Sequence, residues 1–442
     1  MGAYLSQPVT SKASAEGGNG HVNYGSSAMQ GWRTGMEDAH LTVVDLQKNT
    51  HLFGIFDGHG GHEVAKFVSR HLHTSLLETD AYAKGDLSQA LVDAFLRMDE
   101  LMLEEDGRKE LQALARGEDP EEEGKKKKLK HKRSAPQLER LESTSSGSNL
   151  SDEEKGGVAG KRSNLSSAPQ PDSGVAREGG LEASEDGTSG HAGVSEKDTA
   201  EVDEADSEAV TGPRDGEWEG AEEAQAKGGK KKGFLSNAIK GISQKVLSNS
   251  KYKGPAAGCT AVVALMQGDN LLVANAGDSR CIVSRRGQAI EMSTDHKPDN
   301  PEERARIMNA GGFVSAGRVN ASLNLSRAIG DMEYKQNVSL PPKEQIVTAY
   351  PEVRSLKLEQ GDEFLVLACD GIWDVKTNQQ VVDFVKERLQ QNKPLPRIVE
   401  ELFDNCIAPN TSGTGLGCDN MSAVVVTLPS DLSKLTGESA TK

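Results

Sequence analysis

Four aspartates share an unusual setting, because each lies at one end of a short apolar run. Asp57 follows residues 53–56, Asp278 follows 274–277, Asp370 follows 367–369, and Asp419 lies just before 422–428. A single aspartate beside glycine is usually a turn residue, but that interpretation weakens when the pattern recurs. Charges at strand ends can converge on one rim of a sheet, so the pattern predicts a shared carboxylate site.

Carboxylates gathered in this way repel one another unless cations lie between them. Hard oxygen ligands outside a His-rich set favour Mg²⁺ or Mn²⁺ over Zn²⁺. Glycines follow the first aspartate at Gly58, Gly60 and Gly61, and they allow the backbone to approach an ion closely. A main-chain carbonyl is therefore a further candidate ligand.

The elements that would position these carboxylates are visible as apolar patterns. Runs at 52–56, 271–274, 364–369 and 422–428 predict strands. Apolar residues at helical spacing predict helices over 64–72 and 87–102, and a third over 302–310 that ends at two glycines. No internal repeat is visible, so we expect one domain over 23–428, in the size range of a β-sandwich.

A long segment interrupts this domain. Residues 107–232 contain no Phe, Tyr, Ile or Cys and one aromatic residue, Trp218, so they cannot bury enough apolar surface to offset the entropy of ordering. We expect a disordered, charged insertion there, a flexible tail over 1–22 and a C-terminal tail over 429–442. The basic block 125–133 is either a nuclear-import signal or a solvated charge block. Helical spacing over 233–250 favours a helix docked on the core, with membrane or partner contact as the alternative.

Composition limits the class of protein. The chain has 442 residues, 51 Lys+Arg against 67 Asp+Glu, and a net charge of −16, which argues against direct nucleic-acid binding and favours basic substrates. Its five cysteines show no metal-finger or redox spacing, which favours a reducing compartment. No run reaches the roughly 20 apolar residues of a membrane span, and the N-terminus is polar. We expect a monomer in the cytoplasm, the nucleus or both.

Six ordered motifs carry a resemblance to a known family. They read WRTGMEDAH at 32–40, FDGHGG at 56–61, AGDSR at 276–280, LSRAIGD at 325–331, ACDGIWD at 368–374 and CDNMS at 418–422. In order, they resemble the motifs of the PPM (PP2C-type) metal-dependent protein serine/threonine phosphatases. The start MGAYLSQP and the long insertion resemble the gamma-type branch. The insertion departs from that branch because it mixes basic with acidic blocks and lacks a long acidic tract.

The resemblance implies an α+β fold, in which two antiparallel sheets pack face to face with helices outside, in the order α-β-β-α. It implies two Mg²⁺ or Mn²⁺ ions per subunit and dephosphorylation of phosphoserine and phosphothreonine proteins by an activated water. The implied metal ligands are Glu37, Asp57, the carbonyl of Gly58, Asp370 and Asp419. A third, weaker ion would be held by Asp278 and Asp374 beside Asp370.

Three further residues receive catalytic roles from the resemblance. Arg33 grips the phosphate, since a guanidinium can hold two oxygens at once. His59 protonates the departing serine or threonine oxygen, and Asp38 orients water. Arg327 and Asp331 are expected to be structural. On its own, Arg33 would be an ordinary surface arginine, and His59 a structural residue in a glycine-rich turn.

Two other classes of protein compete with this interpretation. One is a non-catalytic scaffold with the same fold that binds phosphoproteins, which the intact set of acidic residues argues against. The other is a two-metal nuclease, which the acidic charge disfavours.

The N-terminus carries one further pattern. Gly2 fits the pattern for N-myristoylation. A single acyl chain gives marginal, reversible membrane affinity, so we expect partial membrane association.

Overall fold

The computed structural model describes residues 4–47, 49–119 and 254–436, and two antiparallel sheets form its centre. The six-stranded sheet contains, in spatial order, β1 (Tyr4–Gly18), β2 (Asn23–Arg33), β16 (Met421–Thr427), β15 (Asp362–Ala368), β9 (Arg280–Arg285) and β10 (Gln288–Glu291). The five-stranded sheet contains β14 (Glu352–Lys357), β8 (Asn270–Ala276), β7 (Ala261–Gln267), β4 (Thr50–Phe56) and β3 (Ala39–Gln47). The four apolar runs of the sequence lie in β4, β8, β15 and β16, as predicted.

Side chains on the central strands alternate between two hydrophobic layers. On β4, Phe53 and Ile55 point into the core between the sheets, whereas Leu52 and Phe56 point to the helices outside. The central strands are buried on both faces, which is why they read as continuous apolar runs.

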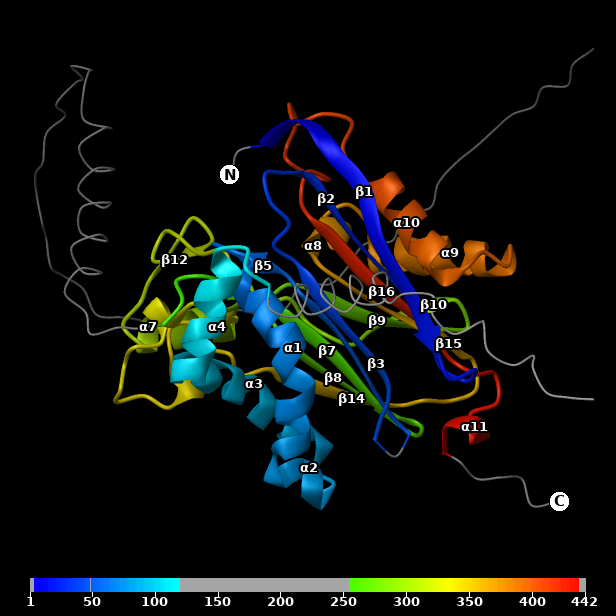
Figure 1. The fold of residues 1–442 in the computed structure, drawn as a ribbon, viewed down its shortest axis with the longest axis horizontal. Helices are drawn as coiled ribbons and strands as arrows, with labels where there is room; N and C mark the ends of the chain where they lie inside the picture. Colours follow the sequence, from blue (N-terminus) through cyan, green and yellow to red (C-terminus); the bar gives the residue numbers. More distant parts are fainter. Residues whose placement is uncertain (1–3, 48, 120–253, 437–442) are drawn as a thin grey trace, which may run out of the picture. The chain divides into compact units, whose positions relative to one another are not determined.

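Helices cover the outer face of each sheet (Figure 1). Outside the five-stranded sheet lie α1 (Glu63–Glu78), α2 (Asp80–Lys84), α3 (Leu87–Leu103) and α4 (Glu105–Ala115). Outside the six-stranded sheet lie α8 (Asp370–Trp373), α9 (Asn378–Gln390) and α10 (Leu395–Cys406). The predicted α-β-β-α sandwich is therefore confirmed.

Smaller elements lie between these layers. A three-stranded sheet contains β13 (Ile329–Gly330), β6 (Gly258–Cys259) and β5 (Gly58–His59), and a hairpin contains β11 (Val314–Ser315) and β12 (Arg318–Val319). The remaining helices are α7 (Pro301–Asn309), η1 (Met332–Tyr334), η2 (Pro342–Glu344) and α11 (Ser433–Thr436).

The prediction of a flexible tail over 1–22 was wrong for most of that range. β1 pairs with β2 over most of its length, and Lys12 forms an ion pair with Asp404 on α10 at 2.6 Å. β1 lies at the edge of its sheet and is mostly exposed. An edge strand gains its hydrogen bonds from the backbone and needs no apolar run, so its polar sequence concealed it.

Two domain boundaries also need correction. α4 continues the domain to Ala115 and buries Leu111 and Leu114, so the insertion does not begin at 107. Beyond 428, α11 packs Leu435 into the core between the sheets, so 429–442 is not wholly a tail. The predictions for Gly2, for the basic block 125–133, for the helix over 233–250 and for the rest of the insertion lie outside the described residues.

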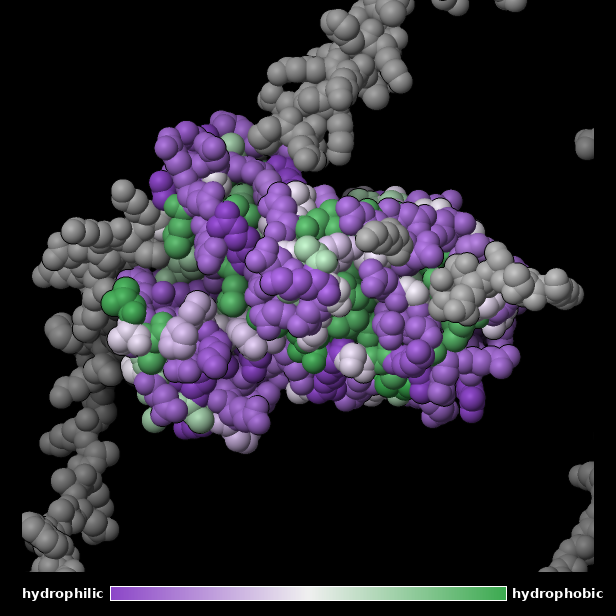
Figure 2. Space-filling view, turned by 90° about the horizontal axis from the view of Figure 1, so that it is seen from below, coloured by the Kyte–Doolittle hydropathy of each residue, from purple (hydrophilic) through white to green (hydrophobic). Residues whose placement is uncertain are grey.

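Among the described helices, none is long and apolar enough to cross a membrane. Figure 2 shows one face of the molecule, on which hydrophilic side chains dominate and hydrophobic ones show in smaller groups.

Candidate active site

Asp57 directly follows the end of β4 and lies at the rim between the two sheets. Its backbone is held on both sides, because Asp57 N donates to Thr260 Oγ1 at 3.3 Å and Thr260 N donates to Asp57 O at 2.9 Å. Gly58 follows in β5, where a Cβ atom would lie 2.3 Å from the carbonyl oxygen of Glu37. Glycine is therefore required at this close approach between the β2–β3 connection and β5.

Four of the other predicted carboxylates lie close enough to Asp57 to act on its pKa. Burial and then the neighbouring carboxylates raise the pKa of Asp57 well above its usual range, and those neighbours are Asp38, Asp370, Asp278 and Asp419. The pKa of Asp370 rises in the same way, by burial and by repulsion from Asp278, Asp419 and Asp374. The tertiary structure therefore brings together one group of negative charges, as the sequence predicted.

Asp38 is a buried carboxyl of this group. It is 7% exposed, and neither of its oxygens has a hydrogen-bond partner of ordinary geometry within the described part of the chain. Burial raises its pKa to about 7. Ser422, Cys369 and Asp57 lie close enough to lower this pKa in part, but they do not satisfy the carboxylate. An unsatisfied buried carboxyl is costly, so this residue indicates a site that is completed by something other than the protein.

Glu37 is positioned by Asn420. The Glu37 backbone N–H donates to Asn420 Oδ1 at 3.0 Å, and Asn420 Nδ2 donates to the carbonyls of Gln30 and Gly35 at 2.7 and 3.0 Å. One buried amide thus ties the loop before β16 to the loop before β3. Its neighbour Asp419 lies in the same loop, so the two segments reach the carboxylate group together.

Two cationic side chains border the group. Arg33 donates to Asp419, and its buried Nε has no hydrogen-bond partner among the described residues. Lys297 donates to Asp278; burial lowers the pKa of Lys297, but the Asp278 carboxylate outweighs this and raises it. Sequence reasoning missed Lys297, because nothing in its local pattern separates it from a surface lysine.

His59 is paired with a residue that the sequence analysis treated as structural. Its Nε2 lies 2.6 Å from Asp331 Oδ2. Burial lowers the pKa of His59, but the Asp331 carboxylate outweighs this and raises it. Asp331 therefore also contacts a proposed catalytic residue, which the sequence analysis did not predict. A signal was available, because Ile329-Gly330-Asp331 has the same order of apolar residue, glycine and aspartate as residues 276–278. Arg327 is structural, as expected, since it pairs with Glu303 at 2.6 Å.

The donor set fits Mg²⁺ or Mn²⁺, although the shell is not closed by protein groups. Within the described ranges, no three His, Cys, Asp or Glu side chains are gathered closely enough to hold an ion. Asp419 and Asp278 instead contact Arg33 and Lys297. However, the group consists of oxygen donors, several of them buried and short of positive charge, which is the environment that hard divalent cations satisfy.

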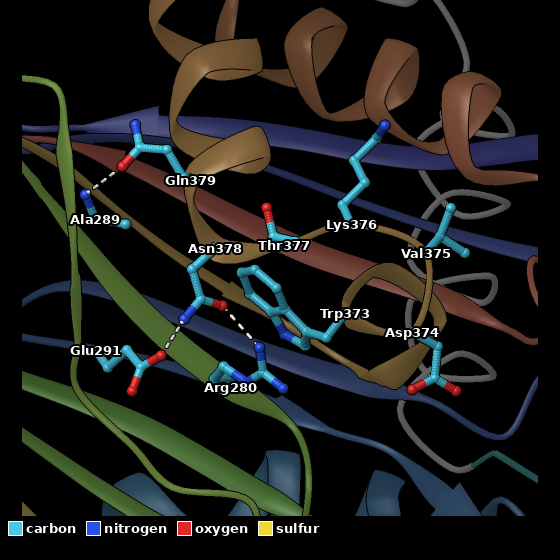
Figure 3. Close-up of a pocket in the computed structure, with 10 residues that line it drawn as sticks. All are labelled: Arg280, Ala289, Glu291, Trp373, Asp374, Val375, Lys376, Thr377, Asn378 and Gln379. Atoms are coloured by element: carbon cyan, nitrogen blue, oxygen red, sulfur yellow. Dashed lines mark hydrogen bonds between the residues drawn. The ribbon is translucent and has the colours of Figure 1, made fainter. Parts of the chain in front are cut away.

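Asp374 is also one of the residues that line a cavity (Figure 3). This cavity of about 630 Å³ is lined by residues of β9, β10 and the segment from α8 to α9. Arg280 points into it, but its charge is already matched by Asp295, at 3.0 Å from both Nε and Nη2, and it donates to Asn378 at 2.7 Å. Asp374 lines this cavity and is exposed, and its carboxylate is close enough to Asp370 to raise the pKa of Asp370.

Comparison with known proteins agrees with this geometry. Residues 22–118 and 196–415 match the family model described as protein phosphatase 2C. The chain belongs to the protein phosphatase 2C family. It is 40% identical over 426 residues to probable protein phosphatase 2C 60 of Arabidopsis thaliana, covering 96% of this chain and 92% of the relative. It is 38% identical over 508 residues to protein phosphatase 1G of Homo sapiens, with the same two coverages.

Solved structures support the fold. A phosphatase from Toxoplasma gondii superposes with a TM-score of 0.53 at 17% identity, over 95% of this chain and 96% of that one. A serine-threonine phosphatase 2C from the same organism gives a TM-score of 0.51 at 14% identity, over 96% and 98%. As a member of this family, the chain is a protein serine/threonine phosphatase.

Proposed function

We propose that the phosphatase hydrolyses phosphoserine and phosphothreonine with two Mg²⁺ or Mn²⁺ ions at the carboxylate group. The residues that would hold them are Asp57, Asp370, Asp419, Glu37 and the carbonyl of Gly58, and Asp278 with Asp374 would hold a weaker third ion. The observation that carries this proposal is the convergence of buried carboxylates with insufficient positive charge around Asp57. Bound divalent cations would polarise a phosphate oxygen and make water acidic enough to react near neutral pH.

The phosphate is received by Arg33 in this proposal. The guanidinium lies at the edge of the carboxylate group, is 39% exposed, and has one buried N–H without a partner in the described structure. An arginine in this position can donate to two phosphate oxygens and offset their charge. Asp38, buried behind the same rim, would orient water toward the phosphorus.

His59 supplies the proton for the leaving oxygen. Asp331 accepts from its Nε2, which leaves the Nδ1–H of the charged ring to donate to the departing serine or threonine. The side chain is 26% exposed, so a substrate can reach it. Protonation matters most when the leaving group is a poor one, such as an alkoxide.

The test is phosphate release from a phosphothreonine peptide after EDTA treatment, with and without added Mn²⁺. We expect no turnover after chelation and recovery with Mn²⁺. Activity that survives exhaustive chelation would falsify the metal mechanism. Peptide binding without turnover in the metal-loaded protein would instead indicate the scaffold function.

The acid role has its own test. His59→Ala should lower turnover of the peptide about 100-fold and should lower turnover of p-nitrophenyl phosphate far less, because nitrophenolate leaves without protonation. Equal losses on both substrates would remove His59 from that role.

We also propose that Gly2 carries a myristoyl chain and that the phosphatase divides between soluble and membrane fractions. Mass analysis of the N-terminal peptide from native cells tests the modification, and an unmodified Gly2 would end the idea. Fractionation of Gly2→Ala beside the natural chain tests the consequence, and equal membrane fractions would show that the lipid does not set location.

A further inference from the structure

The three-stranded sheet of β13, β6 and β5 connects His59 to a buried ion pair that has no part in the metal site. We propose that Asp99 and Lys335 are positioning residues, which hold Asp331 and through it His59 in the geometry required for proton donation. This inference rests on the acid role proposed above for His59.

The sheet register brings His59 and Asp331 together. Gly258 in β6 pairs with His59 in β5 on one side and with Gly330 in β13 on the other. A Cβ atom on Gly258 would lie 2.5 Å from Asp331 Oδ2 and 2.7 Å from His59 Nε2. The hydrogen bond between these side chains therefore crosses directly over Gly258, and only glycine leaves room for it.

The backbone that carries Asp331 is held in an unfavourable conformation. Gly330 has φ 84° and Asp331 has φ 47°, and the left-handed region is unfavourable for a residue other than glycine. Such a conformation persists only where the surroundings determine it. Asp331 N donates to Ala257 O at 3.1 Å, and Gly330 N donates to Asp99 Oδ1 at 2.8 Å.

Asp99 and Lys335 hold residues 328–335, the segment that contains Asp331, at both of its ends. Lys335 Nζ donates to Asp99 Oδ2 at 2.6 Å and to the carbonyl of Ala328 at 2.8 Å. The Lys335 and Asp99 side chains are 7% and 16% exposed. One carboxylate on helix α3 thus holds Gly330 with one oxygen and Lys335 with the other, on either side of Asp331.

The arrangement connects helix α3 to His59, the proposed proton donor. α3 is fixed by buried residues on either side of Asp99, including Met98 and Met102, so its carboxylate is a stationary anchor for the loop. A displacement of about 1 Å in a catalytic group costs on the order of 100-fold in rate. Loss of the anchor should therefore impair proton donation without changing any group that touches substrate.

The experiment compares Asp99→Asn and Lys335→Met with the natural chain on two substrates, a phosphothreonine peptide and p-nitrophenyl phosphate, both with Mn²⁺. We expect kcat for the peptide to fall about 10-fold, with a clearly smaller fall for p-nitrophenyl phosphate and little change in KM. Asp93→Asn is the matched control and should behave like the natural chain, because Asp93 lies on the same helix and its side chain accepts a hydrogen bond from Gln89 of α3.

A second comparison separates this inference from the proposal it rests on. In the His59→Ala background, Asp99→Asn should add no further selectivity between the two substrates, because the residue acts through His59. If His59→Ala itself shows no selectivity, the acid role fails. If His59→Ala is selective and Asp99→Asn lowers both substrates equally, the acid role stands and Asp99 is merely structural.

Gly258→Ala gives an independent test should the ion-pair variants fail to fold. Its added methyl group would separate His59 from Asp331 and should reproduce the selective loss on the peptide. Gly413→Ala is its control, because a Cβ there meets no atom within 4 Å. Folded Gly258→Ala protein with the same selectivity as the control would overturn the inference.

Discussion

Buried carboxyls in two regions of this molecule have opposite electrostatic surroundings. In the first, Glu303 is 3% exposed and is surrounded by donors: Arg306 at 2.7 Å, Arg327 at 2.6 Å and the Ser326 hydroxyl at 2.6 Å. Burial raises the pKa of Glu303, but these donors outweigh it and lower the pKa to about 2. In the second, around Asp57, burial and mutual repulsion raise the pKa of carboxyls instead.

The difference separates a structural charge from a functional one. Glu303 joins α7 to the segment before β13, and its charge is fully matched within the chain. Among the described residues, the cations paired with the carboxylates around Asp57 are Arg33 and Lys297, both at the edge of the group. A fold retains such an uncompensated group when a ligand completes it, in agreement with the clustering of perturbed carboxyls at functional sites.

The largest expected effect is on the uncompensated group. Asp57→Asn should lower phosphate release from a phosphothreonine peptide at least about 10³-fold, the scale of losing one preorganised electrostatic group. In EDTA its melting temperature should equal or exceed that of the natural chain, because one repelling charge is gone. A clear loss of stability in EDTA would contradict the comparison.

The matched change in the compensated group should act on stability instead. Glu303→Gln leaves buried arginines without their charge partner and should lower the free energy of unfolding by about 3 kcal/mol, measured by urea denaturation. Turnover by the folded fraction should remain close to that of the natural chain. Glu302→Gln, its exposed neighbour on α7, is the control and should change neither quantity.

Stabilisation by Mn²⁺ should also differ between the Asp57 and Glu303 variants. Mn²⁺ at 100 times its dissociation constant should stabilise the natural chain by about 2.7 kcal/mol, since binding to the folded state adds to stability. Asp57→Asn should gain much less, whereas Glu303→Gln should gain the full amount. Equal stabilisation of all three proteins would place the ion elsewhere.

The smallest expected effect is the loss of folding stability at low pH that is due to Glu303. The pKa of Glu303 is about 2 in the folded protein, below its unfolded value of about 4.5. The Glu303 charge therefore contributes its full stabilisation above about pH 4.5, and this stabilisation is lost as the pH falls toward 2. Between about pH 4.5 and pH 3.5, the natural chain should lose on the order of 1 kcal/mol more stability than Glu303→Gln. Parallel pH profiles of the two proteins would show that Glu303 is not charge-stabilised.

Local pattern was sufficient where a feature depends on neighbours in sequence. The central strands are apolar because both faces are covered, and their terminal aspartates could be identified from that context alone. β1 was not predicted because it is held by backbone pairing with β2 and not by an apolar pattern of its own side chains. α4 escaped for a similar reason, since Leu111 and Leu114 are its buried residues and its first six residues are charged apart from Gly107.

The sequence by itself determined which residues could do chemistry: the carboxylates through their place at strand ends, and Arg33 and His59 through motifs that resemble those of a known family. Only the tertiary structure decided their partners, because charge compensation acts through space. Arg33 meets Asp419 across 386 positions, and His59 meets Asp331 across 272. Glu303 and Asp57 are both acidic residues in the same chain, but the arginines that compensate Glu303 and the carboxyls that surround Asp57 are brought to them by the tertiary structure.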